Sequence, residues 1–297
     1  MNQSDQFRSA HAAKTGAIYA VLAYSAWGLF PIYWKFLVQI PPIELVSHRI
    51  VWSMVLLIGL LWMQQRKSEL LQLWQSPKTI AALLLTTTLI AINWGIYIYG
   101  VNSGHIVETS LGYYINPLVT VLLGAFVLKE KLNHGQRIAV LIAAIAVANF
   151  VWHFGQIPWI AIALALTFAL YGLLRKLIAV TPIVGLTVET LLATPAALAW
   201  IAYAATTKTG HFGIDGRETL LLIGCGIVTA LPLLWFNNAA KRLRLSTIGF
   251  FQYLAPSLQL FIGVFLYREP FTQIHAVTFG LVWSAIAIYS VTSLRSR

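Results

Sequence analysis

The side chains of this sequence that could do chemistry lie inside long apolar runs. His48 and Arg49 fall within an apolar stretch that begins near residue 43, and Glu189 within one that begins near residue 184. An ionised side chain at the centre of a membrane helix costs about 2.5–3.5 kcal/mol on insertion scales, so it normally faces a bundle interior or water. We interpret all three as candidate substrate-binding residues. Arg49 could contact a carboxylate or another anion at a central cavity, or equally act as a structural clamp or snorkel to the interface.

Aromatic and amide side chains form a second group of candidates. Tyrosine and tryptophan supply stacking surface and amides supply sparse hydrogen bonds, which suits amphipathic organic solutes. The competing interpretation is that the aromatic residues form belts at the membrane interfaces. An amide facing lipid would lack a partner, which favours a cavity for Asn116 and Gln252. The aromatic and amide substrate-binding candidates are Asn93, Trp94, Tyr97, Tyr113, Tyr114, Asn116, Trp235, Asn237, Asn238, Gln252 and Tyr253.

The sequence carries none of the motifs that mark an enzyme or a metal site. Its seven histidines are scattered, without a His-Glu-x-x-His pattern, and it has no Walker A loop. We therefore expect no catalytic residues, no metal and no cofactor. The driving force would then be a gradient, and Glu189 or Glu108 could exchange protons.

Composition indicates a membrane protein. Hydrophobic residues make up 59% of the chain and charged residues 10%, against about 50% and 25% in soluble domains. The net charge of +11 does not indicate nucleic acid binding, because the basic residues stand in short clusters without interleaved stacking aromatics. The clusters are typical of the positive-inside bias, so the lipid bilayer is the expected partner.

Apolar runs of about 20 residues predict ten membrane spans. The first run is too long and too aromatic for a signal peptide, so we expect it to remain as a span. The linker 64–78 is predicted to be either a short surface helix or a plain loop. The fold class is therefore an all-α integral membrane protein, with spans near residues 15–37, 43–63, 79–101, 107–128, 136–154, 158–177, 184–207, 219–240, 246–267 and 272–294.

Lysine and arginine are unevenly divided between the two sides of these spans. With the N-terminus inside, fifteen of the 20 Lys and Arg residues lie on the cytoplasmic side, four lie outside, and Arg49 lies within a span. This asymmetry predicts that both termini are cytoplasmic.

Two stretches of the chain resemble each other, LGYYINPLVTVLLGAFVLKEKL at 111–132 and FFQYLAPSLQLFIGVFLYREPF at 250–271. They indicate a duplication, with a first five-helix repeat at 1–154 and a second at 155–297. Because each repeat has an odd number of spans, the two repeats must be inverted, with a substrate site between them near the midplane. The matched prolines Pro117 and Pro256 are candidate hinges, although a fixed kink is the more common outcome.

The repeat also predicts local partners for the two charged residues. Aligning Pro42 with Pro182 makes Arg49 the counterpart of Glu189 at a mirrored depth, which places them roughly 13 Å apart along a membrane core about 30 Å thick. A direct salt bridge is therefore not expected. Glu108 or Glu44 could pair with Arg49, and the candidate partners of Glu189 are Asn237, Asn238 and Lys241.

Three longer motifs carry a family resemblance: ELVSHRIVWS at 44–53, INWGIYIYGVNSGHIVETSLGYYINP at 92–117 and GFFQYLAPSLQ at 249–259. With them the chain resembles the EamA-type permeases of the drug/metabolite transporter superfamily, in particular the RarD branch. The resemblance implies ten helices in two repeats, a bacterial inner-membrane permease and an association with chloramphenicol sensitivity. It also implies that the third, fourth, eighth and ninth spans form much of the cavity wall and that a basic residue at Arg49 is common.

The leading functional prediction is a secondary transporter that exports small amphipathic organic solutes by alternating access. A passive facilitator or channel stays open, because residues alone do not show whether a gradient drives the solute. A membrane enzyme acting on lipids is disfavoured, because the loops lack acidic or histidine clusters. The expected partners are a small-molecule solute and the bilayer, with proton coupling and a homodimer as further possibilities. The spans near 136–154 and 272–294 have few polar groups, so they are expected to serve either as scaffold or as dimer contacts.

Overall fold

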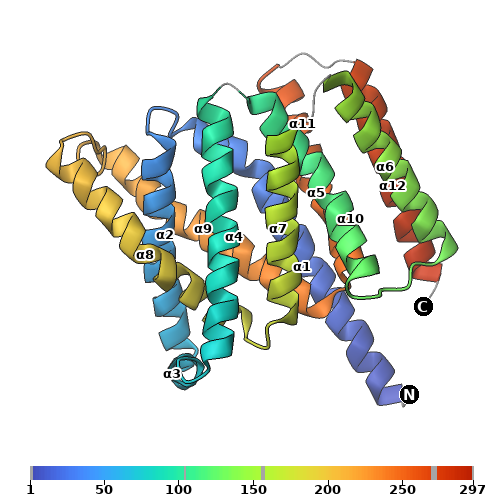
Figure 1. The fold of residues 1–297 in the computed structure, drawn as a ribbon, viewed down its shortest axis with the longest axis horizontal. Helices are drawn as coiled ribbons and strands as arrows, with labels where there is room; N and C mark the ends of the chain where they lie inside the picture. Colours follow the sequence, from blue (N-terminus) through green and yellow to red (C-terminus); the bar gives the residue numbers. More distant parts are fainter. Residues whose placement is uncertain (1–2, 104, 155–157, 269–272, 296–297) are drawn as a thin grey trace.

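The computed structural model describes residues 3–103, 105–154, 158–268 and 273–295, and all regular structure in these ranges is helical. The helices pack together as a bundle, with α6 and α12 side by side at one edge and α8 near the opposite edge (Figure 1). Their bounds are α1 Gln3–Lys35, α2 Pro42–Met63, α3 Lys67–Leu73, α4 Pro77–Asn102, α5 Ile106–Phe126, α6 His134–Phe154, α7 Trp159–Leu177, α8 Pro182–Thr206, α9 Gly216–Arg242, α10 Leu245–Gln252, α11 Leu254–Phe261, the π-helical turn η1 Ile262–Leu266 and α12 Gln273–Arg295.

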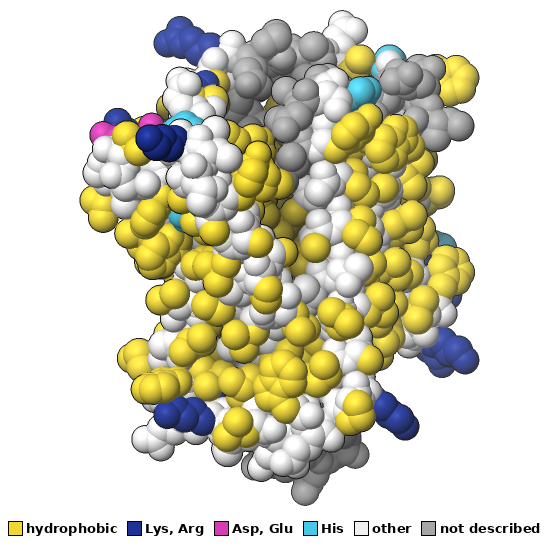
Figure 2. Space-filling model, turned by 60° about the vertical axis from the view of Figure 1, so that its left-hand side comes forward, with side chains coloured by type: hydrophobic (Ala, Val, Ile, Leu, Met, Phe, Trp, Pro, Cys, Tyr) yellow, Lys and Arg dark blue, Asp and Glu magenta, His cyan; other side chains and the backbone are white. Residues whose placement is uncertain are grey.

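The helices have the length and apolarity of membrane spans. Nine candidate spans occur in the described residues, and the apolar stretch Leu111–Phe126 of α5 is shorter. Hydrophobic side chains cover the middle of the face in Figure 2, while Lys and Arg side chains lie toward its ends. A band of apolar surface between charged ends is what a bilayer requires, since lipid cannot solvate charges. The prediction of an all-α membrane protein is confirmed.

The helix bounds follow the predicted spans closely, with two differences. The linker 64–78 contains the short helix α3, none of whose side chains is buried. The run predicted as one span at 246–267 is instead α10, α11 and η1, with Tyr253 between the first two helices. Pro256 explains the break, because a proline ring clashes with the carbonyl four residues earlier, here that of Gln252, where α10 ends. Pro117 lies within α5, which continues through it.

Helices from the two halves of the chain pack against each other rather than forming two separate bundles. In the first half, α1 contacts α9 and α11, and α2 contacts α8 and α9. In the second half, α7 contacts α4 and α5, and α8 also contacts α4. The other cross-half pairs include α5 with α10, α6 with α12, α1 with α10 and α3 with α8. The space between the halves is therefore the centre of the molecule.

Glycine allows α2 and α9 to approach closely in this arrangement. A Cβ atom at Gly226 would overlap the backbone carbonyl of Trp52, and the hydroxyl of Ser53 donates to the carbonyl oxygen of Gly226 at 3.2 Å. Small residues permit such contacts in membrane bundles. The contact matters for the site below, because α2 carries Arg49 and α9 carries the residue that holds it.

Gly226→Ala should lower the midpoint of thermal unfolding in detergent, because overpacking a close contact costs about 1–3 kcal/mol. Gly59→Ala is the matched control on α2, since nothing lies within 4 Å of the place its Cβ would take. Alanine is favoured over glycine in a helix by about 1 kcal/mol, so the control should unfold at or above the wild-type temperature. Equal unfolding temperatures for the two variants would contradict the close approach.

Candidate functional site

A cavity of about 370 Å³ lies between the two halves of the chain. Residues of α1, α2, α4, α5, α7, α9, α10 and α11 line it, so every wall depends on the cross-half packing. Aromatic rings dominate the wall, and Arg49 is its one charged member among the described residues. The aromatic lining residues are Tyr24, Trp27, Phe30, Trp34, Trp94, Tyr97, Tyr113 and Phe168.

The structure brings about half of the candidates from the sequence to this cavity. Seven substrate-binding candidates and both hinge candidates line it: Arg49, Asn93, Trp94, Tyr97, Tyr113, Asn116, Gln252, Pro117 and Pro256. Seven others lie outside its wall: His48, Tyr114, Glu189, Trp235, Asn237, Asn238 and Tyr253.

The candidates outside the cavity wall have packing partners elsewhere. Tyr114 stacks on Phe150 of α6, with ring centroids 5.2 Å apart, and is buried on that side of α5. The ring of His48 stacks on Phe212, with centroids 4.9 Å apart. Tyr253 is buried in the cluster that joins α5 and α10 to α6 and α12, and Trp235 packs against the largest apolar cluster.

Arg49 is fixed at the cavity wall by contacts from three helices. Its Nε donates a hydrogen bond of 2.9 Å to Oγ1 of Thr229 on α9. Its guanidinium carbon lies 5.2 Å from the ring centroid of Trp34 on α1 and 4.9 Å from that of Trp94 on α4. Contacts of a guanidinium with aromatic faces are favourable and set the plane of the group. The position of the charge is therefore defined by the fold.

The predicted pairing of Arg49 with Glu44 is wrong. The carboxylate of Glu44 is buried and accepts from the backbone N–H of His211 at 2.7 Å, and its other oxygen lies 2.9 Å from Nδ1 of the same histidine. The side chain of Glu108, the other predicted partner, lies outside the described residues. Within the described residues Arg49 makes no ion pair.

Some amide side chains at the cavity are already hydrogen-bonded within the helix bundle. Asn93 donates from Nδ2 to the carbonyl oxygen of Leu164 and to Oγ1 of Thr167, each at 2.9 Å, and so ties α4 to α7. Asn116 accepts from Thr120 one turn later at 3.2 Å. Gln259 donates to the carbonyl oxygen of Trp27 at 3.1 Å and ties α11 to α1.

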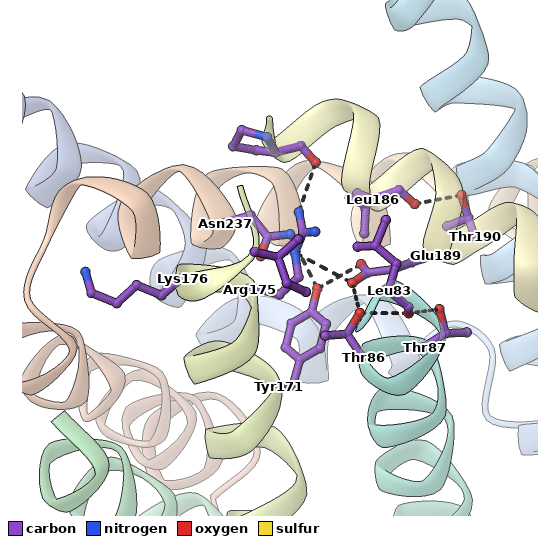
Figure 3. Close-up of polar contacts among 12 residues, drawn as sticks. Leu83, Thr86, Thr87, Tyr171, Arg175, Lys176, Leu186, Glu189, Thr190 and Asn237 are labelled. Carbon is purple, nitrogen blue, oxygen red and sulfur yellow. Dashed lines mark hydrogen bonds and ion pairs between the residues drawn. The ribbon is translucent and has the colours of Figure 1, made fainter. Parts of the chain in front are cut away.

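Glu189 belongs to a separate buried polar cluster (Figure 3). Its Oε1 accepts from the hydroxyl of Thr86 at 2.5 Å and lies 3.6 Å from Nε of Arg175. Its Oε2 accepts from the hydroxyl of Tyr171 at 3.3 Å. Asn237 completes the cluster, accepting from Arg175 Nε at 3.2 Å. The cluster thus joins α4, α7, α8 and α9, and the arginine neutralises the buried carboxylate.

The predicted partners of Glu189 are corrected by this geometry. Asn237 contacts Arg175 and Tyr171 rather than the carboxylate. Asn238 accepts from Arg242 at 2.7 Å, and Lys241 donates to the backbone carbonyls of Lys176 and Ile178. Glu189 does have a local partner, as expected, but that partner is Arg175.

Arg175 is one of the fifteen basic residues that the sequence places on the cytoplasmic side, but its side chain is buried in the bundle and not exposed. The side chain is only 1% exposed, and that of Glu189 is 4% exposed. Gly185 leaves the room for it, since a Cβ there would overlap the guanidinium. Without Arg175, fourteen Lys and Arg residues still lie on the predicted cytoplasmic side against four outside.

A small apolar space separates the two sites. It measures about 40 Å³ and is lined by Glu189 and Tyr171 at one end. Its wall shares Ile90, Trp94, Thr229 and Leu233 with the main cavity. Trp94 and Thr229, two of the three side chains that contact Arg49, therefore also lie between the cavity and the buried cluster.

Comparisons with known proteins identify the family. Residues 14–152 match the EamA-like transporter family. An uncharacterized transporter of Vibrio cholerae is 45% identical over 285 residues, which cover 96% of this chain and 94% of the relative. Protein RarD of Escherichia coli is 40% identical, with 96% of each chain covered. The chain belongs to the EamA-like transporter family, in its RarD-like branch.

The fold of this RarD-like transporter also has a solved counterpart. A crystal structure superposes with a TM-score of 0.71 at 17% identity and covers 94% of this chain and 98% of the other. At that identity the likeness concerns the fold alone. The family and the apolar helices together make the chain a membrane transporter, and they agree with the expectation that it is not an enzyme.

Sequence reasoning missed several residues of the RarD-like transporter's site. Trp34 and Thr229, which contact Arg49, were not among the candidates. Trp27 lines the cavity and was not among them either. Arg175 could have been found from its spacing to Glu189, because a lone acid in an apolar run demands a cation from a neighbouring helix.

Arg175→Met should destabilise the folded transporter by about 3–5 kcal/mol, because it leaves Glu189 buried without a counter-charge. Arg175→Met combined with Glu189→Gln should recover much of that loss, since the stranded charge is gone. Arg66→Gln is the control, because the Arg66–Glu69 pair is exposed and such pairs contribute about 0–1 kcal/mol. Unfolding in detergent, followed by circular dichroism, gives all three values. Additive losses in the double variant would contradict the pairing.

Proposed function

We propose that the protein is a secondary transporter that moves small amphipathic organic solutes across the bacterial inner membrane by alternating access, in the direction of export. The observation that carries the proposal is the cavity itself. It lies at the centre of the bundle, draws its wall from both halves of the chain, and combines aromatic rings with a few polar groups. Binding sites for small molecules have this composition.

The proposed architecture is ten spans in two inverted repeats. It counts α5 as a span in addition to the nine candidate spans. The packing supports this architecture, because a contact between two helices of opposite halves recurs between their counterparts in the other repeat. The contact of α1 with α9 matches that of α7 with α4, and the contact of α2 with α9 matches that of α8 with α4. In Figure 1 the start of α1 and the end of α12 both lie toward the lower side of the bundle. With the bias of Lys and Arg, this supports cytoplasmic termini.

Alternating access needs a part of the wall that can move. The break between α10 and α11 at Tyr253 interrupts the helical hydrogen bonds beside the cavity, and Pro256 and Pro117 both line it. We therefore propose that this side of the cavity bends. The cluster around Glu189 ties four helices together and would stay fixed as long as the carboxylate is ionised.

Proton coupling through Glu189 is part of the proposal. The carboxylate is buried, and only the small apolar space and its shared wall separate it from the main cavity. A proton taken up there would weaken the pairing with Arg175 that joins α7 to α8. A gradient could thus bias the helices that line both spaces.

The transporter reconstituted in proteoliposomes should accumulate a transported solute against the concentration gradient of that solute when a proton gradient is imposed. Candidate solutes come from a screen of aromatic drugs and metabolites. Arg175→Met combined with Glu189→Gln should keep downhill flux but lose the response to the gradient. Arg49→Ala should abolish flux while the protein still inserts and unfolds cooperatively.

The outcome also separates transport from passive passage. Flux that only equalises the solute on both sides, with or without the gradient, would support a facilitator instead. Wild-type flux in Arg49→Ala would remove Arg49 from the pathway.

A further inference from the structure

The guanidinium of Arg49 is only partly used by the protein. Its Nε is bonded to Thr229. The two terminal nitrogens make no hydrogen bond within the described residues, yet they are not among the buried atoms left without a partner. Since Arg49 lines the cavity, the open end of the guanidinium faces that space. Two parallel N–H donors in one plane are the arrangement that binds a carboxylate through both of its oxygens.

Within the described residues, no acidic side chain compensates the charge of Arg49. No acidic residue lines the cavity within the described part of the chain. Two nearby carboxylates are already engaged, Glu44 with His211 and Glu189 with Arg175. The rings of Trp34 and Trp94 contribute favourable contacts but no negative charge. A cation in an apolar cavity of low dielectric is stabilised strongly by any anion that enters.

Arg175 is an arginine with a structural role and can be compared with Arg49. It is almost fully buried, pairs with Glu189, and has two of its three nitrogens bonded to Asn237 and to the carbonyl oxygen of Pro182. Arg49 differs in each respect: it is only partly buried, and among the described residues it has no counter-charge and its terminal nitrogens, at the cavity wall, have no hydrogen-bond partner. The contrast argues that Arg49 is reserved for a ligand.

We propose that the cavity selects small aromatic monocarboxylates, with the carboxylate held by Arg49 and the ring among Trp27, Trp34 and Phe168, an inference that rests on the proposed transport function. The volume of about 370 Å³ is at the small end of ligand pockets, which suits one or two fused rings. A single cation accommodates one negative charge, so dianions and cations are disfavoured. Loading then produces a neutral pair inside the bilayer.

The test is a set of three ligands that share a ring and differ in charge: indole-3-acetate, its neutral amide indole-3-acetamide, and the cation tryptamine. Their affinities for the purified full-length transporter in detergent are measured by calorimetry at about pH 7. The anion should bind at least about tenfold tighter than the amide, because hydrogen bonds to charged groups are worth a tenfold change or more. The cation should bind more weakly than the amide.

Two variants assign the preference to Arg49. Arg49→Gln should remove the advantage of the anion over the amide, and Arg49→Lys should retain part of it, because the charge remains but the planar pair of donors is lost. Arg137→Gln is the control, since Arg137 is exposed and its one side-chain hydrogen bond among the described residues is to the carbonyl oxygen of Leu132. It should keep the wild-type preference. The wild-type ligand comparison stands even where a variant fails to fold.

The possible outcomes divide clearly. Equal affinity for the anion and the amide, tighter binding of the cation, or no binding of any of the three overturns the inference. So does an anion preference that survives Arg49→Gln. Flux of a neutral solute with no preference for the acid would overturn it while leaving the transport proposal intact. Arg49-dependent binding of the acid without flux would support the inferred site and contradict transport.

Discussion

A positive charge in the low-dielectric interior of a membrane protein has to be neutralised nearby or kept beside water or a ligand. This chain contains both solutions. Arg175 is buried against Glu189 and donates to Asn237 and to the carbonyl oxygen of Pro182. Arg49 is held by Thr229 and two tryptophan rings, with its remaining donors turned to a cavity. Burying Arg175 costs desolvation free energy, but the ion pair with Glu189 holds the helices together. The charge of Arg49, in contrast, is stabilised by whatever ligand or water enters the cavity.

The arrangement of the helices follows from keeping these two charges apart. The buried cluster joins α4, α7, α8 and α9, so it spans both halves of the chain and fixes the partition behind Trp94 and Thr229. On the opposite wall α10 and α11 are interrupted beside Pro256. A fixed side and an interrupted side around one cavity are the parts that alternating access needs. The close approach of α2 and α9 at Gly226 is what brings Thr229 to Arg49.

Hydropathy was enough to predict the helices, because each must cross about 30 Å of hydrocarbon. Hydropathy was less informative about the direction in which each side chain points from its helix. Neighbouring residues on a helix point about 100° apart, so Tyr113 faces the cavity while Tyr114 packs on Phe150, and only the neighbouring helices decide which does which. Arg175 was counted on the cytoplasmic side because a charge near the end of a predicted span looks solvent-exposed until its partner is known. The break at Tyr253 was missed for a related reason, since a proline alone does not distinguish α5, which continues, from α10, which ends.

Side-specific labelling of the cavity tests the central claim most directly. Cys225 is the one cysteine of the chain, so Cys225→Ala gives a background in which Tyr113→Cys and Tyr114→Cys can be compared. With a membrane-impermeant maleimide applied from either side of oriented vesicles, Tyr113→Cys should react from both sides and be protected by solute, while Tyr114→Cys should not react. A reactive Tyr114→Cys, or a Tyr113→Cys that reacts from neither side, would contradict a central cavity that opens alternately.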